Sequence, residues 1–489
     1  MTLDLAKLSG KLEALIDDVG RERDLQAALW RPLIERPGFA DSALNMAAYR
    51  AVRRRDLRTL QRQLMALGLS SLGRLESRVM PTLLAVRRAL AALSGGSPAP
   101  GPSTRAFFAG ERRLAAQTRA IFGASSAPVA LLVTCPSEAA DDSAFMLDLA
   151  ERGVQAVRIN CAHDSAEVWA RMIGHLRAAE ASSGRDLKVF MDLAGPKIRI
   201  GEVCRPGRSK RARHGDLIAI ARPGALEAIE VDGRHFAVEC TLPEALDAAR
   251  LGDRVFIDDG KLGAEVEQIL PWGVVARVTL VEARGLRLKP EKALNFPDTN
   301  LSVDALTEKD RIDLEFVAAH ADGIEFSFVQ SAADVRMLQD ALAELRPDDW
   351  RDMTLILKIE TARAVANLPE IIVQAAGRQP TAIMIARGDL SVEIGFARTA
   401  EMQEEILWWG EAAAVPVIWA TQVLEQMVKT GTPSRGEMTD AAMAARAECV
   451  MLNKGPYLLP AIDQLQLLLR RMESNQHKKA PKLRRLMSW

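Results

Sequence analysis

The sequence predicts an α/β protein: a closed barrel of eight parallel strands with a small β domain inserted after the third strand and a helical extension at the N-terminus. From residue 128 onward, short apolar runs of strand length alternate with amphipathic segments of helix length, a pattern typical of a (β/α)8 barrel. The gap after the third run is too long for one helix. The runs are 128–135, 154–160, 187–193, 322–328, 354–360, 381–387, 415–421 and 447–452.

Residues 1–104 are expected to form the helical extension and a linker. The stretch Ser94–Ser103 reads SGGSPAPGPS, and its Gly/Pro/Ser-rich composition is typical of a linker. A basic cluster in the extension could hold an anionic partner, although such runs are more often a solvated helix face. Its members are Arg50, Arg53, Arg54, Arg55 and Arg58. Helical periodicity is clearest in Leu57, Leu60, Leu64, Leu67 and Leu69.

The long gap after the third run has the character of a β domain. Alternating patches such as AIEVDGRHFAVEC and WGVVARVTLVEA are separated by Gly-Asp turns. We therefore expect the barrel in two parts, residues 105–200 and 289–475, around an inserted domain at 201–288. Residues 476–489 would form a basic C-terminal tail.

Composition excludes several classes of function. Lys+Arg and Asp+Glu both number 64, so the zero net charge gives no sign of a nucleic-acid partner. The 5 cysteines are scattered and odd in number, which favours reduced thiols over a disulfide frame or a zinc site. The N-terminus lacks the pattern of a signal peptide, and no apolar run is long enough to span a bilayer. We expect a cytoplasmic protein with no membrane partner.

Charged and polar residues gather where the predicted strands end, which is where parallel barrels place their active sites. A lone Lys or Asp at a strand end is usually a cap, but a ring of them on successive strands indicates a site. Lys and Arg side chains can neutralise the charge of a phosphoryl group, and carboxylates beside them can bind Mg²⁺. No P-loop or GxGxxG turn is present. The ring comprises Arg158, Asn160, His163, Asp192, Lys197, Arg199, Lys358, Glu360, Gly388, Asp389 and Thr421.

Seven segments between about residues 128 and 465 carry a family resemblance. They read VRINCAH, DLAGPKIR, FIDDG, LKIET, MIARGDLSVEI, WATQVLEQM and TPSRGEMTDAA. In the same order they resemble the pyruvate kinase segments ARLNFSH, DTKGPEIR, YVDDG, SKIEN, MVARGDLGVEI, CATQMLESM and RPTRAEVSDVA. The resemblance implies a TIM barrel with a small β-barrel lid and phosphoryl transfer between phosphoenolpyruvate and ADP, giving pyruvate and ATP. It also implies a homo-oligomer.

The resemblance further implies a role for each matching residue. Glu360 and Asp389 would hold the catalytic Mg²⁺, or Mn²⁺ in its place. Lys358 would sit at the transferring phosphoryl group and steady the enolate, and Arg158 would bind the substrate phosphate. Thr421 and the backbone N–H groups around Gly388 and Asp389 would grip the substrate carboxylate. The residues assigned to the nucleotide side and to the closing lid are Asn160, His163, Arg199 and Asp259.

Three departures from the family pattern leave two alternatives open. The family's DTKGP lysine is Ala194, its SFVR arginine is Gln330, and its SGETA motif has become Leu452-Asn453-Lys454-Gly455. The common form's C-terminal effector domain is also expected to be missing. The chain could be another Mg²⁺ and enolpyruvate barrel enzyme of lyase or aldolase type, or a non-catalytic regulator. The retained Arg158 and Lys358 favour the kinase.

One further departure concerns K⁺. In the family, four side-chain oxygens hold this ion, and the chain keeps two of them, on Asn160 and Asp192, but has Ala162 and Leu193 at the other two positions. A hard cation loses affinity when oxygen ligands are replaced by methyl groups. The family's GPEIR glutamate is Lys197, whose ammonium could supply the positive charge, as in the branch of the family that works without a monovalent cation. We expect a requirement for Mg²⁺ but not for K⁺.

Overall fold

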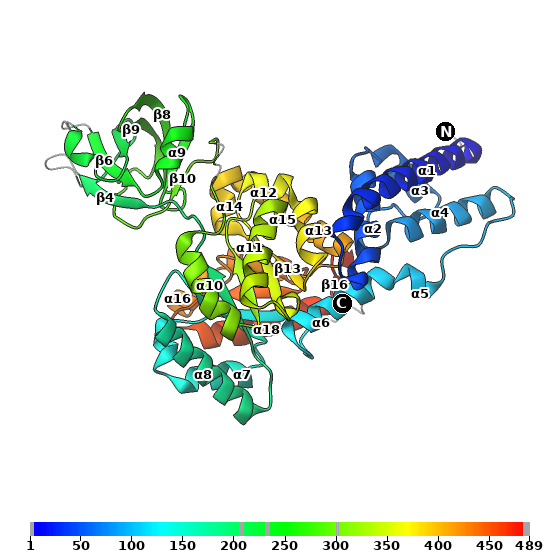
Figure 1. The fold of residues 1–489 in the computed structure, drawn as a ribbon. Coiled ribbons are helices and arrows are strands. Elements are labelled where there is room, and N and C mark those ends of the chain that lie inside the picture. The colour runs from blue at the N-terminus through cyan, green and yellow to red at the C-terminus, as the bar shows by residue number, and fades with distance from the viewer. Residues whose placement is uncertain (1–3, 205–209, 230–234, 300, 302, 483–489) are drawn as a thin grey trace.

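The computed structural model describes residues 4–204, 210–229, 235–299, 301 and 303–482, and Figure 1 shows its three parts side by side. A strand barrel lies in the middle, with the β domain on one side of it and the N-terminal helices on the other. Within the described residues, no helix is both long enough and apolar enough to cross a membrane.

The central barrel is closed and has eight strands, each paired in parallel with its two neighbours. This confirms the predicted fold class, and each of the eight apolar runs contains one strand of the barrel. Helices cover the outside, so most strand residues are buried, as expected for parallel sheets. The strands are β1 (Ala130–Thr134), β2 (Ala156–Asn160), β3 (Lys188–Leu193), β11 (Gly323–Phe326), β12 (Thr354–Ile359), β13 (Thr381–Ala386), β14 (Val417–Ala420) and β15 (Cys449–Leu452).

Helices link the strands and form the outer layer around the barrel (Figure 1). Their apolar faces and the outward side chains of the strands make the largest core cluster. The longer of these helices are α7 (Ser143–Glu151), α8 (Ala166–Ser183), α10 (Glu308–His320), α11 (Ala332–Leu345), α13 (Leu368–Ala376), α15 (Phe396–Ala413), α17 (Arg435–Ala444) and α18 (Leu458–Glu473).

A helix closes the end of the barrel where the strands begin. Helix α6 (Ala109–Phe122) directly precedes β1, and its last two residues join the cluster that fills the barrel interior. The Phe122 ring meets Phe190 of β3 edge to face, with 5.9 Å between ring centroids. With this end filled by apolar side chains, the polar residues of the interior lie towards the opposite end.

The inserted domain is a seven-stranded sheet with its own apolar core. A bridge between Arg199 and Ala293 joins the two edges of the sheet, which gives it the expected barrel-like form. The sheet ends at Asn295, beyond the predicted boundary at residue 288. Its strands are β4 (Ile200–Cys204), β5 (Leu217–Ala221), β6 (His235–Cys240), β7 (Arg254–Ile257), β8 (Leu262–Leu270), β9 (Gly273–Val281) and β10 (Leu294–Asn295).

The N-terminal extension has a core of its own and docks on helix α15 of the barrel. Asn45 fastens the joint, because its side-chain amide donates to the carbonyl oxygens of Glu76 (2.7 Å) and Ala412 (2.8 Å). Its Oδ1 accepts from the Val79 N–H at 3.0 Å. The extension comprises α1 (Leu5–Trp30), α2 (Pro37–Arg53), α3 (Arg58–Ala66) and α4 (Val79–Leu93), and the short α5 (Thr104–Phe107) leads into α6.

Most arginines of the basic cluster in the extension contact other side chains of the protein. Arg50 pairs with Glu370 of the barrel at 2.7 Å, and Arg55 pairs with Glu22 at 2.5 Å. The Arg53 guanidinium lies 4.8 Å from the Trp408 ring centroid, and Arg58 pairs with Asp56. Four of the five arginines therefore have internal partners, and Arg50 and Arg53 connect the extension to the barrel.

Candidate active site

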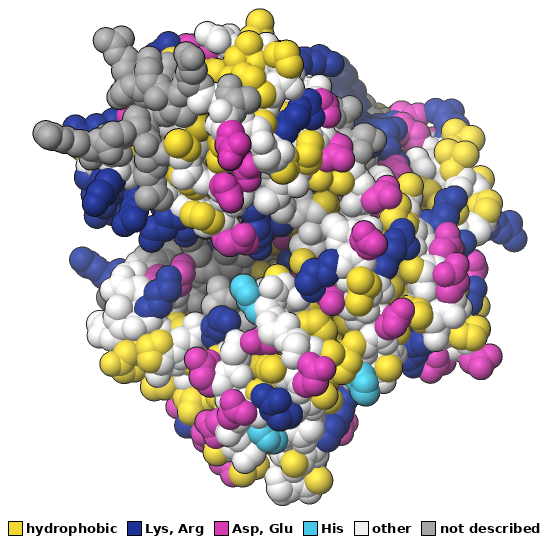
Figure 2. Space-filling model, turned by 60° about the vertical axis from the view of Figure 1, so that its left-hand side comes forward, with side chains coloured by type: hydrophobic (Ala, Val, Ile, Leu, Met, Phe, Trp, Pro, Cys, Tyr) yellow, Lys and Arg dark blue, Asp and Glu magenta, His cyan; other side chains and the backbone are white. Residues whose placement is uncertain are grey.

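A cavity of about 390 Å³ lies over the ends of the barrel strands, between the barrel and the inserted domain. Figure 2 shows the hollow at this place, with Lys and Arg side chains gathered on the upper lobe beside it. Among its lining residues are Arg158, Asn160, Asp192, Lys197, Arg199, Asp259, Lys358, Glu360, Gly388, Asp389 and Thr421. The structure therefore brings together almost all of the residues that the sequence singled out.

Lys358 occupies the centre of the site on β12. Its Nζ donates to Oδ1 and Oδ2 of Asp192 at 3.0 and 3.2 Å and to the Ser327 hydroxyl at 2.7 Å. It also lies 3.3 Å from Oε1 of Glu360. Burial alone would lower the pKa of Lys358, but the Asp192 and Glu360 carboxylates raise it above its usual value. The side chain is thus a fixed positive charge throughout the physiological pH range.

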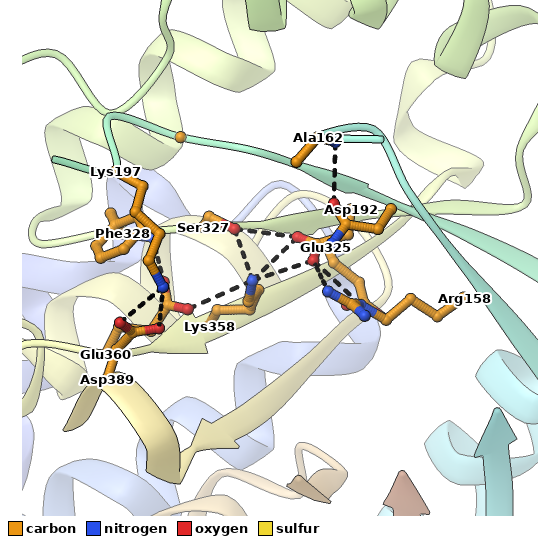
Figure 3. Close-up of polar contacts among 12 residues, drawn as sticks. Arg158, Ala162, Asp192, Lys197, Glu325, Ser327, Phe328, Lys358, Glu360 and Asp389 are labelled. Atoms are coloured by element: carbon orange, nitrogen blue, oxygen red, sulfur yellow. Dashed lines mark hydrogen bonds and ion pairs between the residues drawn. The ribbon is translucent and has the colours of Figure 1, made fainter. Parts of the chain in front are cut away.

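Arg158, on β2, is held from one side by carboxylates (Figure 3). Its Nε lies 3.1 Å from Oδ2 of Asp192 and 3.0 Å from Oε2 of Glu325, and one terminal nitrogen also donates to Asp192. The other terminal nitrogen donates to the Thr134 hydroxyl at 3.2 Å. Burial opposes ionisation of Asp192, but the Arg158 and Lys358 cations hold its pKa below the usual range.

Glu360 directly follows β12, and Asp389 lies in the first turn of the helix that follows β13; both line the cavity. Oε2 of Glu360 accepts from the Phe328 N–H at 2.6 Å, which orients the carboxylate. Burial raises the pKa of Glu360, and the nearby Asp389 carboxylate adds to the effect. A cation placed between the two carboxylates would relieve this repulsion.

These two carboxylates fit a magnesium site. Mg²⁺ prefers hard oxygen ligands and is usually held by one or two carboxylates together with substrate phosphates and water. Within the described part of the chain, no cluster of three or more His, Cys, Asp or Glu side chains could hold a metal by itself. A pair of carboxylates beside a cavity is the donor set that suits an ion whose other ligands come from a bound phosphate and water.

The Lys197 ammonium lies on Asp389, at 3.0 and 3.2 Å from its two oxygens. Asn160 and Asp192 line the same cavity as Lys197, but the contacts described for them are with groups other than the Lys197 ammonium. Oδ1 of Asn160 accepts from the Ala162 N–H at 2.9 Å. The Leu193 side chain is fully buried and contributes to the apolar core.

A strained loop follows β14 and presents Thr421 to the cavity. Thr421, Gln422 and Leu424 all have positive φ, at 68°, 58° and 48°. Arg387 fixes the loop, because its guanidinium donates to the carbonyl oxygens of Ala420 (2.8 Å) and Thr421 (2.5 Å). The loop packs closely on the first turn of α14 (Arg387–Ile394).

Gly388 in this first turn has a steric reason to be glycine. A Cβ there would lie 2.9 Å from Cγ2 of Thr421. The start of α14 therefore lies beside Thr421. The first N–H groups of a helix have no partner within the helix, and such a helix start favours an anionic group. This arrangement suits the carboxylate of a small acid.

The residues expected on the nucleotide side are more spread out. Arg199 and Asp259 line the cavity from the inserted domain and its hinge, and Arg199 donates to the carbonyl oxygen of Glu291 at 3.0 Å. Asp259 has φ 55°, in a turn where Asp258 pairs with Lys261 and Lys292. His163 is exposed and lies outside the set of residues that line the cavity.

The three departures can also be located. Ala194 and Asn453 line the cavity, and Oδ1 of Asn453 accepts from the Thr134 hydroxyl at 3.4 Å. Gln330 lies in the loop that leads into α11, where its N–H donates to Asp334 at 2.8 Å. The substitutions at 194 and 453 therefore change the site itself, whereas position 330 borders a neighbouring cavity where the inserted domain joins the barrel.

Sequence reasoning missed Glu325, Ser327 and Thr134, which hold Lys358 and Arg158 in place. A signal for Glu325 was present: it is an acidic residue in the middle of the apolar run 322–328, two residues before Ser327 and so on the same face of the strand. The contacts themselves could not be read from the sequence, because Glu325 accepts from Arg158 on β2 and Ser327 donates to Asp192 on β3.

Comparison with known proteins shows which family the chain resembles. The family model described as pyruvate kinase, barrel domain, matches residues 130–457. A pyruvate kinase of Mycobacterium intracellulare is 32% identical over 344 residues, which are 69% of this chain and 68% of the relative. A pyruvate kinase of Dictyostelium discoideum is 30% identical over 337 residues, covering 67% of this chain and 63% of the relative. The chain thus spans about two thirds of the length of these relatives.

Proposed function

The chain belongs to the pyruvate kinase family, and from this premise we propose that it transfers the phosphoryl group of phosphoenolpyruvate to ADP, giving pyruvate and ATP. The observation that carries the proposal is the convergence on one cavity of Lys358, Arg158 and the carboxylate pair Glu360 and Asp389. Together they supply positive charge for a phosphoryl group and oxygen ligands for its metal ion.

In the proposed step, the bond between phosphorus and the enol oxygen breaks while a terminal oxygen of ADP bonds to phosphorus. Arg158 binds the phosphate, and Lys358 neutralises the negative charge that grows on the enol oxygen. The enolate then takes a proton on carbon and leaves as pyruvate. The first turn of α14 and Thr421 hold the substrate carboxylate, so the reacting phosphate is placed against Lys358.

Glu360 and Asp389 would hold Mg²⁺, or Mn²⁺, which would neutralise charge on the phosphoryl oxygens when bound. The inserted domain is proposed to act as a lid that brings Arg199 and Asp259 to the nucleotide phosphates. Asn160 and His163 belong to the same side of the site in this proposal. Closure would exclude water, which otherwise competes with ADP for the phosphoryl group.

We propose in addition that K⁺ is not required. Two of the oxygens that would hold it are replaced by Ala162 and Leu193, while Lys197 brings an ammonium into the same cavity. The contact of this ammonium with Asp389 keeps a covalently attached positive charge near the site of the substrate phosphate. The lysine side chain is long and flexible, so its charge can also serve the Asn160 side of the cavity.

The proposed reaction takes place in a reducing compartment such as the cytoplasm, because all five cysteines are free and four of them are buried.

The test is to incubate the purified chain with phosphoenolpyruvate, ADP and Mg²⁺ and to follow all phosphorus species by ³¹P NMR. If the chain is a kinase, the phosphoenolpyruvate signal should fall and the ATP signal should rise by an equal amount. Release of inorganic phosphate from phosphoenolpyruvate without formation of ATP would indicate another barrel enzyme. No change at all would indicate a non-catalytic protein.

A further inference from the structure

Glu325 is a buried carboxylate directly below the active-site cavity, in the middle of the barrel. It lies on β11 with no exposed surface, and its Oε2 accepts from Nε of Arg158 at 3.0 Å. Its Oε1 is buried and has no hydrogen-bond partner among the described residues. A buried carboxylate with one oxygen unpaired is costly, so its position calls for an explanation beyond packing.

The explanation lies in the hydrogen bonds of Arg158. A guanidinium has five N–H groups, and the described contacts use the one on Nε and one on each terminal nitrogen. Nε is shared between Asp192 and Glu325, while Thr134 holds the opposite end. One N–H remains on each terminal nitrogen, which is the arrangement that binds a phosphate with two parallel bonds.

We propose that Glu325 is a positioning residue that acts through Arg158: it fixes the guanidinium at Nε, and its protonation state sets how much of the Arg158 charge is available to the substrate phosphate. When Glu325 is neutral, the guanidinium is compensated by Asp192 alone. When Glu325 is ionised, two carboxylates compensate one guanidinium, and its attraction for the phosphate falls.

The surroundings of Glu325 favour titration near neutral pH. The groups that face it are Arg158 on β2, Asp192 on β3, Lys358 on β12 and Cys449 on β15. Burial raises the pKa of Glu325 to about 7; the Arg158 and Lys358 cations oppose this rise, and the Asp192 charge adds to it. Protonation therefore dominates below neutrality and ionisation above it.

The consequence is a change in substrate affinity with pH. As the pH rises through about 7, Glu325 loses its proton and the dissociation constant for phosphoenolpyruvate should rise, by about tenfold between pH 6 and pH 8.5. The maximal rate should change much less, because Lys358 and the carboxylate pair do not depend on Glu325 for their charge. The inference rests on the proposed function, since it takes phosphoenolpyruvate as the ligand of Arg158.

The experiment measures phosphoenolpyruvate binding to the full chain by calorimetry, with Mg²⁺ and without ADP, from pH 6 to pH 8.5 at constant ionic strength. Glu325→Gln keeps the shape and the acceptor for Nε but cannot ionise. Its affinity should match that of the neutral wild type and lose the extra pH step. Ionisation of the substrate phosphate itself is common to both proteins and cancels in their ratio.

Two further variants complete the test. Glu325→Asp keeps a carboxyl and should restore a pH step even if the glutamine variant is less stable. Glu411→Gln is the matched control: burial raises the pKa of this α15 carboxyl too, but it contacts Ser77 at 3.2 Å and lies away from Arg158. The control should keep the wild-type pH step.

A ratio of wild-type to Glu325→Gln affinities that stays constant with pH within about twofold would overturn the proposal. A fall in kcat without a change in affinity would also overturn it. If the wild type binds phosphoenolpyruvate with the predicted pH step but forms no ATP, the proposed function fails and the inference about Glu325 stands. If ATP forms but the wild type and Glu325→Gln show the same pH dependence of affinity, the proposed function stands and the inference about Glu325 fails.

Discussion

The ammonium of Lys197 lies 3.0 and 3.2 Å from the two carboxylate oxygens of Asp389, across the joint between the inserted domain and the barrel. Lys197 follows β3 and Asp389 follows β13, so the contact links two strand ends. The same carboxylate is one of the two proposed metal ligands. The ammonium that is proposed to replace K⁺ therefore contacts a proposed ligand of Mg²⁺.

The first prediction is that the reaction does not need K⁺. Rates measured in K⁺ and in tetramethylammonium at equal ionic strength should agree within about twofold, because the Lys197 ammonium provides the positive charge. Lys197→Glu should lower the rate in tetramethylammonium. A several-fold loss of wild-type activity without K⁺ would contradict the prediction, and so would full K⁺-independent activity of the variant.

The second prediction concerns the metal ligands. Glu360→Gln and Asp389→Asn each remove a negative ligand and should lower kcat by about 10²-fold or more, with a higher Mg²⁺ concentration needed for half-maximal rate. The measurement is a Mg²⁺ titration of the initial rate for both variants. Near-normal turnover at limiting Mg²⁺ would show that the residue concerned is not a ligand.

The third prediction concerns Lys358. Its ammonium neutralises charge that develops mainly in the transition state, so Lys358→Met should lower kcat far more than it raises KM. Loss of the cation also leaves Asp192 with one partner fewer, so thermal unfolding of the variant is the necessary control. An effect confined to KM would make Lys358 a binding residue only.

The fourth prediction concerns the joint between extension and barrel. Asn45→Ala removes three hydrogen bonds and leaves the carbonyl oxygens of Glu76 and Ala412 without this donor, so we expect a loss of about 3 kcal/mol in the free energy of unfolding. Thermal or urea unfolding measures it. Leu44→Ala, at the adjacent exposed position, is the control and should change stability by less than about 0.5 kcal/mol. Equal effects of the two substitutions would contradict the role of Asn45.

The barrel could be predicted from the sequence because each buried parallel strand is a separate apolar run. The predicted end of the inserted domain at residue 288 falls too early because β10 has only two residues, Leu294 and Asn295, and a strand of this length has no periodicity to detect. The position of α6 at the end of the barrel, with Phe122 in the barrel interior, could not be predicted either. A helix that covers the end of a barrel has the same amphipathic pattern as a helix that packs against its outer surface.

The candidate site was predictable to the level of the strand that carries each residue. Strand ends of a closed barrel meet at one rim, so Lys358, Glu360 and Asp389 had to approach one another. The contact partners were not predictable, because they depend on side-chain directions across strands that are distant in the sequence. The Lys197 contact with Asp389 and the Arg158 contact with Glu325 are of this kind.

The most direct test of the proposed function is the rate of pyruvate formation from phosphoenolpyruvate by the purified chain, coupled to NADH oxidation by lactate dehydrogenase. The rate should depend on both ADP and Mg²⁺, and it should fall by about 10²-fold or more in Glu360→Gln. Pyruvate formation that is independent of ADP, or equally fast in that variant, would contradict the proposal that this cavity transfers a phosphoryl group to ADP.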